Sequence, residues 1–210
     1  LYIPKIITLS YEYVNKNTRK YIEDNYGTEI LNLYGTTEFG YIFIENEQGK
    51  MKLCPDLVDV RLEPIDSKNN IYTLIIDSYK NEYMPLINYR VGDMVQATPK
   101  EYAKFSTEKQ VSRMAGREKD YDRIRLPVTV VDDIFSEFED ILIYQLQYVS
   151  KNKLIIRYET RNFKKLEDEK ERQLVKEIEK LNIGDVQIKH VQAISPERSG
   201  KFAIIKFGEE

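Results

Sequence analysis

The sequence predicts a mixed architecture of α/β and α+β type, because three parts of the chain have different textures. An apolar run, a helical segment and a second apolar run come first, which is the pattern of two parallel strands joined by a helix. Short strand-like runs separated by turn residues then continue to about residue 115. Strands mixed with helical segments fill residues 116–210. We therefore expect the end of a parallel α/β subdomain, a small antiparallel β subdomain and a small C-terminal α+β domain.

The first part, residues 1–45, is expected to form a strand, a helix and a parallel strand. Lys5–Leu9 is a short apolar run that suits a buried strand. The segment Asn15–Tyr26 is expected to be helical, and Gly27 is placed where a helix stops. Glu29–Leu33 is then a second strand. Since ligands of open α/β sheets bind at the carboxyl ends of strands, the residues that end this strand are candidates for a site.

The second part, residues 46–115, completes a large domain of residues 1–115 and is expected to be rich in β-structure. Asn46–Gly49 and Asp66–Asn70 are turn-forming stretches between apolar runs. The predicted strands around these turns are Tyr41–Ile44, Val58–Glu63 and Ile71–Ile76.

The third part, residues 116–210, has the size of a small independent domain, about a hundred residues. Asp132 or Asp133 is expected to cap a helix whose inner face carries apolar residues, namely Ile134, Phe135, Phe138 and Ile141. A charged helix is expected over Lys164–Leu181 as a solvated face. The predicted strands are Ile143–Tyr148, Leu154–Tyr158, Val186–Val191 and Phe202–Phe207.

Composition excludes several classes of protein. The 32 basic and 35 acidic residues are mixed along the chain without a basic stripe, so no nucleic-acid partner is expected. The single cysteine, Cys54, excludes an internal disulfide and is interpreted as a small apolar residue in a reducing, cytoplasmic compartment. No apolar run is long enough to span a membrane. His190 has no metal-ligating neighbours in sequence and is interpreted as structural.

The stretch Asn32–Glu38 interrupts an apolar pattern with polar groups that suit a nucleotide. Tyr34 offers a ring for stacking on a base, and Gly35 lets a backbone approach a ligand closely because it has no Cβ. Thr36 and Thr37 can donate hydrogen bonds to phosphate oxygens, and Glu38 can bind Mg²⁺, which prefers oxygen ligands. The alternative is a polar turn whose side chains satisfy backbone groups.

Three further motifs carry candidate functional residues. In Met84–Asp93, the final carboxylate suits the hydroxyls of a ribose, although Asp93 in a plain turn is the alternative. In Gly116–Asp120, Arg117 offers a fork of donors near a domain junction, or else forms a surface ion pair. Near the C-terminus, Lys201 follows a glycine and can reach developing negative charge, or else belongs to a hairpin turn.

The four motifs, taken in this order, resemble those of the adenylate-forming superfamily of acyl-CoA synthetases, adenylation domains and luciferases. The resemblance is closest to the phenylacetate–CoA ligase branch and its capsule-biosynthesis relatives. That branch has Tyr-Gly-x-Thr-Glu, Met-Pro-x-Ile-x-Tyr-Arg-Thr-Gly-Asp and Gly-Arg-x-Asp-Asp motifs and a late Gly-Lys pair. The matching residues here are Tyr34–Glu38, Met84–Asp93, Gly116–Asp120 and Gly200-Lys201.

The resemblance implies a role for each matched residue. Asn32 and Tyr34 would line the adenine of ATP, with Gly35 and Thr36 beside them. Thr37 would contact the α-phosphate and Glu38 would bind Mg²⁺. The remaining roles would be the ribose for Asp93 and Arg117, the hinge of a mobile C-terminal domain for Lys119, and the bridge between ATP and the carboxylate substrate for Lys201.

The implied reaction activates a carboxylic acid as an acyl-adenylate, releases pyrophosphate, and then transfers the acyl group to CoA or another acceptor. The chain lacks the Ser/Thr/Gly-rich phosphate loop that precedes the first motif in the family, so we expect the C-terminal half of such an enzyme, inactive as a fragment. The stretch Ile124–Pro127 has no glycine where thioester-forming members have one, which leaves CoA open against an alcohol, an amine or a carrier protein.

The alternative function is a non-catalytic relative that binds a nucleotide or a partner protein with the same fold. The missing glycine and the missing phosphate loop both favour it. If the chain is a fragment, residues 1–45 would expose a sheet edge, and self-association or partial disorder of that region is expected.

Overall fold

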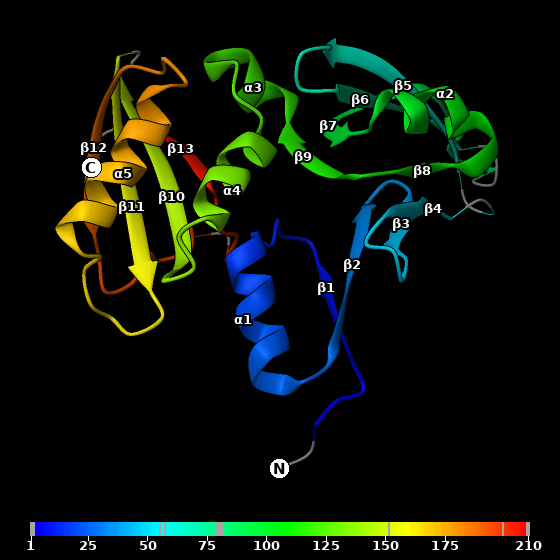
Figure 1. The fold of residues 1–210 in the computed structure, drawn as a ribbon. Helices are drawn as coiled ribbons and strands as arrows, with labels where there is room; N and C mark the ends of the chain where they lie inside the picture. The colour runs from blue at the N-terminus through cyan, green and yellow to red at the C-terminus, as the bar shows by residue number, and fades with distance from the viewer. Residues whose placement is uncertain are drawn as a thin grey trace. The chain divides into compact units, whose positions relative to one another are not determined.

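The computed structural model describes residues 3–54, 56, 58–78, 82–150, 152–198 and 200–208. They form two compact units (Figure 1). The first unit comprises Leu1–Tyr13 and Thr28–Thr129, and the second comprises Val14–Gly27 and Val130–Glu210. The boundaries of these units differ from the expected division between residues 115 and 116. That division was expected to separate a large domain from a mobile C-terminal domain, and this domain division stays a prediction. The mixed α/β and α+β architecture is confirmed.

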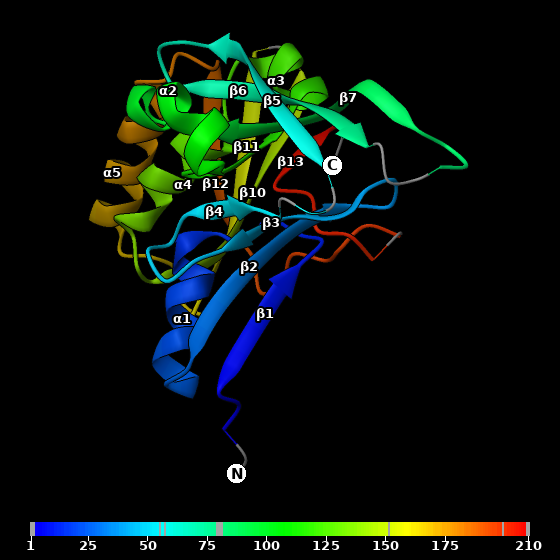
Figure 2. The ribbon, with the colours of Figure 1, turned by 90° about the vertical axis from the view of Figure 1, so that its right-hand side faces the viewer.

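The first unit contains a five-stranded sheet whose strands follow the order β1-β2-β3-β4-β8. Strands β1 and β2 are parallel, with Ile6 opposite Glu29 and Ser10 opposite Leu33, and the other pairs are antiparallel. Strand β1 is the edge of this sheet, as expected, and Figure 2 shows it outside β2. The strands are β1 (Ile6–Ser10), β2 (Glu29–Thr36), β3 (Gly40–Glu45), β4 (Met51–Leu53) and β8 (Gln110–Val111).

A second, antiparallel sheet of the same unit has the strand order β5-β6-β7-β9. Its apolar side chains and those of the first sheet form one core, which includes Phe43 of β3 and Leu74 of β6, both fully buried. The strands are β5 (Asp59–Asp66), β6 (Ile71–Ser78), β7 (Leu86–Gln96) and β9 (Arg113–Arg117), and the helices are α2 (Pro99–Glu108) and α3 (Glu118–Ile124).

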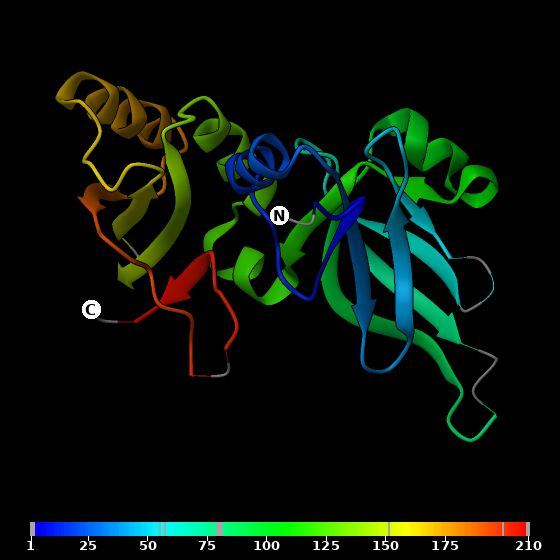
Figure 3. The same cartoon turned by 90° about the horizontal axis from the view of Figure 1, so that it is seen from below.

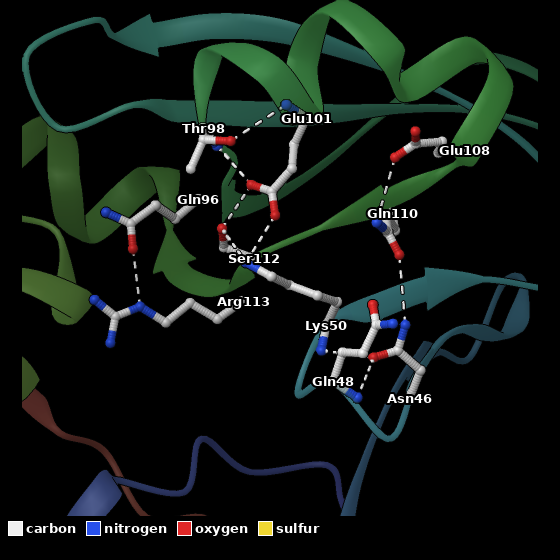
Figure 4. Close-up of polar contacts among 10 residues, drawn as sticks. All are labelled: Asn46, Gln48, Lys50, Gln96, Thr98, Glu101, Glu108, Gln110, Ser112 and Arg113. Carbon is white, nitrogen blue, oxygen red and sulfur yellow. Dashed lines mark hydrogen bonds and ion pairs between the residues drawn. The ribbon is translucent and has the colours of Figure 1, made fainter.

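Helix α2 was not predicted, although its start is encoded in the sequence. Thr98 accepts a hydrogen bond from the backbone of Glu101, and the Glu101 carboxylate accepts one from the backbone of Thr98, which together make a capping box. The Glu101 carboxylate also forms an ion pair with Lys50 at 2.8 Å and accepts a hydrogen bond from the Ser112 hydroxyl at 2.7 Å (Figure 4). Lys50 lies in the turn between β3 and β4, and Ser112 lies between β8 and β9, so the two contacts of Glu101 join α2 to both of these segments.

The second unit is a four-stranded sheet of order β12-β11-β10-β13 with helix α5 against it (Figure 1). Phe135 and Tyr144 stack at 3.9 Å between ring centroids, and Leu174 and Ile178 of α5 are fully buried. The strands are β10 (Ile141–Ser150), β11 (Lys153–Thr160), β12 (Asp185–His190) and β13 (Ile205–Phe207), and the helices are α1 (Lys16–Tyr26), α4 (Val128–Ser136) and α5 (Asp168–Glu179).

Helix α1 begins and ends where the sequence predicts. The side chain of Asn15 accepts a hydrogen bond from Thr18, and Gly27 adopts a left-handed φ of 59° and donates to the carbonyl of Glu23. These are an ordinary N-cap and a glycine C-cap. The packing was not predicted, because α1 lies between β1 and β2 in sequence but belongs to the second unit.

Polar side chains connect the first turn of α1 to the rest of the second unit, and we call them the α1 anchor. Its members are the buried Asn15, Asn17 and Asp132 and the half-buried Thr18. The Asn17 amide nitrogen lies within 3.1 Å of the carbonyl oxygens of Phe135, Phe138 and Ile141. Thr18 donates to the carbonyl of Leu142 at 2.8 Å. The Asn17 amide is thus a common donor for three carbonyls between the end of α4 and the start of β10.

The prediction that Asp132 or Asp133 caps the following helix is wrong. Helix α4 begins at Val128, directly after Pro127, whose missing N–H is not needed at a helix start. Asp132 therefore lies inside the helix, where it accepts hydrogen bonds from the backbone N–H of Lys16 and the hydroxyl of Tyr144. Its carboxylate therefore accepts a hydrogen bond from the first residue of α1 and does not cap α4.

Candidate functional site

The centre of the candidate site is the carboxylate of Asp93, near the end of the long strand β7. Asp93 lies directly opposite Arg117 in the antiparallel pairing of β7 with β9. The Arg117 Nε donates to Asp93 Oδ1 at 3.1 Å. Two predicted motifs, separated in sequence by helix α2, are therefore joined by strand register.

The third member of this group is Tyr34, on strand β2 of the other sheet in the first unit. Its hydroxyl donates to Asp93 Oδ2 at 2.8 Å, and its ring lies beside that of Phe43, 6.1 Å between centroids. Burial and the negative charge of Asp93 raise the pKa of Tyr34 far above its usual value, so the phenol stays protonated and remains a donor. We call Tyr34, Asp93 and Arg117 the Asp93 cluster.

The Asp93 cluster keeps capacity for a ligand. A carboxylate has about four acceptor positions, and Tyr34 and Arg117 use one each. The Asp93 side chain is 19% exposed and that of Arg117 is 55% exposed. The arrangement can therefore accept two further hydrogen bonds from a diol.

The second strand, predicted over Glu29–Leu33, extends further into the stretch Asn32–Glu38 than expected. Strand β2 continues to Thr36, and a short turn leads into β3, as Figure 3 shows for the two blue strands. A Cβ on Gly35 would lie 2.4 Å from the carbonyl oxygen of Gly40, so the hairpin itself requires glycine there. The role of Gly35 beside a ligand stays a prediction.

The hydroxyl and carboxylate groups of the turn are divided between structure and solvent. Thr36 Oγ1 accepts a hydrogen bond from the backbone N–H of Phe39 at 3.3 Å, as in the polar-turn alternative. Thr37 and Glu38 are exposed at the tip of the hairpin. Their proposed phosphate and magnesium contacts remain predictions.

A buried carboxylate next to Asn32 was missed by the sequence analysis. Glu45 Oε2 accepts hydrogen bonds from the backbone N–H of Asn32 at 2.8 Å and from its side-chain amide at 2.9 Å. Glu45 is only 6% exposed. The signal in the sequence is a glutamate at the end of the apolar run Tyr41–Ile44, where a charge is not expected without a partner.

The second and third motifs also meet through a pair that the sequence analysis did not single out. Arg90 Nε donates to Glu118 Oε2 at 2.9 Å and Arg90 Nη1 approaches Glu63 Oε2 at 3.2 Å. The hydrogen bond to Glu118 raises the pKa of Arg90 above its usual value. Since all these groups lie in the first unit, they fix the end of β9 and the start of α3 to the second sheet.

The predicted hinge residue, Lys119, is exposed in the first turn of α3. Helix α3 ends at Ile124. Arg125 then adopts a left-handed conformation with a φ of 53°, and its backbone N–H donates to the carbonyl of Tyr121. Arginine therefore adopts the conformation that glycine favours at a helix end. The role of Lys119 as a hinge stays a prediction.

Lys201 belongs to the second unit and is exposed. It closes a turn in which the backbone N–H of Glu197 donates to the Lys201 carbonyl at 2.8 Å, and Gly200 has a φ of 81°. Ser199 of the same motif lies outside the described residues. The catalytic role of Lys201 stays a prediction.

The described residues contain no cluster of three or more His, Cys, Asp or Glu side chains that can hold a metal ion. Magnesium is commonly held by one or two carboxylates together with substrate phosphates, so a single exposed Glu38 fits that mode. Burial raises the pKa of Cys54, which disfavours a reactive thiolate. Among the helices of the described part of the chain, none is long and apolar enough to cross a membrane.

Comparisons with known proteins place the fold. No protein-family model matches the sequence, and no curated protein matches it. Among solved structures, 2-hydroxyisobutyryl-CoA ligase in its postadenylation state is similar with a TM-score of 0.67 at 14% identity, covering 95% of this chain and 48% of that chain. A benzoate CoA ligase from Burkholderia xenovorans LB400 is similar with a TM-score of 0.65 at 15% identity, covering 94% of this chain and 44% of that chain.

A third structure, the anthranilate CoA ligase AuaEII in complex with anthranoyl-AMP, is similar with a TM-score of 0.64 at 13% identity. The similarity covers 94% of this chain and 42% of the AuaEII chain. All of them are acyl-CoA ligases, and the chain spans about half their length. This chain therefore has a fold found in CoA ligases.

Proposed function

We propose that this chain is the nucleoside-binding and C-terminal part of an ATP-dependent ligase that activates a carboxylic acid as its acyl-adenylate. The Asp93 cluster carries this proposal, because three residues predicted separately from three motifs share one carboxylate. The likeness of the whole described fold to acyl-CoA ligases supports it. The finer resemblance to the phenylacetate–CoA ligase branch, and the cytoplasmic location, are part of the same proposal.

In the proposed site Asp93 accepts hydrogen bonds from the two ribose hydroxyls. Arg117 and Tyr34 hold the carboxylate from two sides, so its acceptor positions are fixed before the nucleotide arrives, which lowers the entropic cost of binding. Asn32 and Tyr34 line the base. Gly35 and Thr36 form the backbone beside it.

The proposed reaction begins with attack of a substrate carboxylate oxygen on the α-phosphorus of ATP. A bond forms between that oxygen and phosphorus, and the bond to the bridging oxygen breaks, so pyrophosphate leaves with its charge. Thr37 donates a hydrogen bond to the α-phosphate and Lys201 holds the two negative reactants together. Glu38 and the phosphates would hold Mg²⁺, which would neutralise part of the phosphate charge.

Acyl transfer to CoA or to another acceptor is proposed as the second step, with Lys119 as the hinge for the change of domain orientation. In this chain, the stretch that follows α3 is the apolar Leu126-Pro127-Val128. Leu126 and Val128 are both buried, at 6% and 8% exposure. This buried apolar stretch favours no particular acceptor.

The ribose role is tested with the chain as it stands, by calorimetric titration with AMP. Asp93→Asn is expected to weaken AMP binding by about tenfold or more, the effect of losing a charged acceptor. Asp59→Asn is the matched control, because Asp59 is an exposed carboxylate of the same unit that contacts only Lys109 among the ion pairs found. AMP lacking both ribose hydroxyls is expected to bind both Asp93 forms equally. A full Asp93→Asn effect on that analogue overturns the ribose contact.

The adenylation role is tested in the full-length protein by pyrophosphate exchange with a panel of carboxylic acids. Lys201→Ala is expected to abolish exchange while AMP binding persists, because the lysine acts on charge that develops in the reaction. Lys206→Ala, in strand β13 of the same unit, is the matched control. AMP binding without exchange in the wild type would favour the non-catalytic alternative.

A further inference from the structure

Glu45 occupies an unusual place for a carboxylate. It is 6% exposed at the end of strand β3, and the register that pairs Leu33 with Ile44 places it opposite Asn32. Both hydrogen bonds from Asn32, one from the backbone and one from the side chain, reach the same oxygen, Oε2. Since burying a carboxylate costs free energy, this pair needs an explanation beyond filling space.

The contact decides which end of the Asn32 amide is available. Glu45 Oε2 accepts both hydrogen bonds from Asn32, so the NH₂ of Asn32 turns toward Glu45. The opposite orientation would set the amide oxygen against Glu45 Oε2 and lose the 2.9 Å hydrogen bond. The group that Asn32 presents away from Glu45 is therefore its acceptor oxygen, Oδ1.

The position of Asn32 relative to the Asp93 cluster matches the span of a nucleoside. Asn32 and Tyr34 lie two residues apart on β2, so their side chains share one face of the strand. Two residues of a strand cover about 7 Å. If Asp93 holds the ribose beside Tyr34, the base lies along the strand toward Asn32.

We propose that Glu45 is a positioning residue that orients Asn32 Oδ1 toward the base, so that the site selects bases with an amino group at position 6. Adenine offers a donor at that position, whereas hypoxanthine and guanine offer an acceptor, which Oδ1 repels. The inference rests on the proposed function and deepens it, because it adds a source of adenine specificity to the nucleotide site.

The experiment compares AMP with IMP, which differ in the amino or carbonyl group at position 6, by titration of the chain. The wild type is expected to prefer AMP by about tenfold or more, the size of one well-placed hydrogen bond against a repulsive contact. Glu45→Met removes the acceptor but keeps a side chain of similar length, so the Asn32 amide can turn over. The preference for AMP is expected to fall at least threefold.

Two further variants separate orientation from stability. Glu45→Gln is expected to retain the preference, because its amide oxygen can occupy the place of Oε2. Glu47→Met, an exposed neighbour in the turn after β3, is the matched control and is expected to change nothing. An equal loss of AMP and IMP binding in Glu45→Met overturns the inference and leaves the ribose site intact. Absence of AMP binding in the wild type overturns the proposed function itself.

A measurement on the wild type covers the case in which Glu45→Met does not fold. The side-chain NH₂ signal of Asn32, identified by its loss in Asn32→Asp, is expected to be protected from solvent exchange in a proton–nitrogen spectrum. Exchange as fast as that of Gln173, an exposed side chain of α5, overturns the inference.

Discussion

The Asp93 cluster and the α1 anchor are both groups of polar side chains, but they differ in burial and in unused capacity. In the α1 anchor, Asn17 and Asp132 are 4% and 2% exposed. Apart from the Tyr144 hydroxyl, which donates to Asp132, the partners named above are carbonyls and N–H groups of the backbone. In the Asp93 cluster, Arg117 is 55% exposed and the central carboxylate keeps acceptor positions for a ligand.

The difference teaches how to separate a structural polar group from a functional one. Buried donors that satisfy backbone acceptors stabilise the fold, because removing one leaves several unpaired groups in a dry place. A half-exposed ion pair contributes little to folding, and its carboxylate also accepts a hydrogen bond from Tyr34 of the other sheet, an arrangement that a ligand explains better. We therefore expect stability and nucleotide binding to depend on different clusters.

The largest effect on stability is expected from Asn17→Ala. The substitution removes a buried amide that lies within hydrogen-bond distance of three carbonyl oxygens between α4 and β10, two of which, those of Phe135 and Phe138, keep backbone donors. We expect a loss of about 1–3 kcal/mol in the free energy of unfolding. Urea unfolding followed by circular dichroism measures it. The control is Asn25→Ala in the same helix, where an exposed amide donates only to the carbonyl of Tyr21. Because alanine favours a helix more than asparagine does, helix propensity alone would stabilise both variants, and an Asn17→Ala variant no less stable than Asn25→Ala contradicts the role of the anchor.

A smaller effect is expected at Glu101, whose surroundings lie between the two extremes. Burial alone would raise its pKa, but hydrogen bonds from Lys50 and Ser112 outweigh it and lower the pKa of Glu101 below its usual value (Figure 4). A carboxylate with a lowered folded-state pKa adds stability above its unfolded pKa, and that stability is lost as the pH falls through the folded value.

The Glu101→Gln variant is therefore expected to lose about 1 kcal/mol at pH 7 and less below about pH 4, where the wild type also loses the charge. Urea unfolding at a series of pH values measures the difference. The control is Glu108→Gln in the same helix, whose side chain is 43% exposed and pairs with Lys104. A Glu101→Gln loss that does not shrink in acid contradicts the role of the charge.

Local sequence signals predicted much of the fold. The caps Asn15 and Gly27 bound α1 in sequence as in structure, and the parallel pairing of β1 with β2 followed from the strand, helix and strand pattern. The unit to which α1 belongs was not predictable, because it depends on carbonyls of residues 135–142 that are distant in sequence. Helix α2 was missed although Thr98 and Glu101 form a capping box.

The resemblance placed the site residues around one nucleotide, but it did not predict the contacts among Tyr34, Asp93 and Arg117. That Asp93 faces Arg117 depends on the register of β7 with β9, which is irregular between Met94 and Val95, and such a register is not encoded in any short motif. Glu45 was missed because it directly follows the predicted apolar strand Tyr41–Ile44, where a charged residue usually marks the point at which the chain turns toward solvent. Its importance appears only when Asn32 is found on the neighbouring strand.

The smallest effect on stability is expected from Arg117→Ala, and it is the sharpest test of the comparison. The ion pair with Asp93 is half-exposed, so the free energy of unfolding should change by no more than about 0.5 kcal/mol. AMP binding should weaken by several-fold, because Asp93 then loses the group that fixes one of its oxygens. The control is Arg125→Ala, which removes an exposed arginine of the same unit paired with Asp122. A stability loss as large as that of Asn17→Ala, with AMP binding unchanged, would mean that the Asp93 cluster holds the two sheets together and that the ligand lies elsewhere.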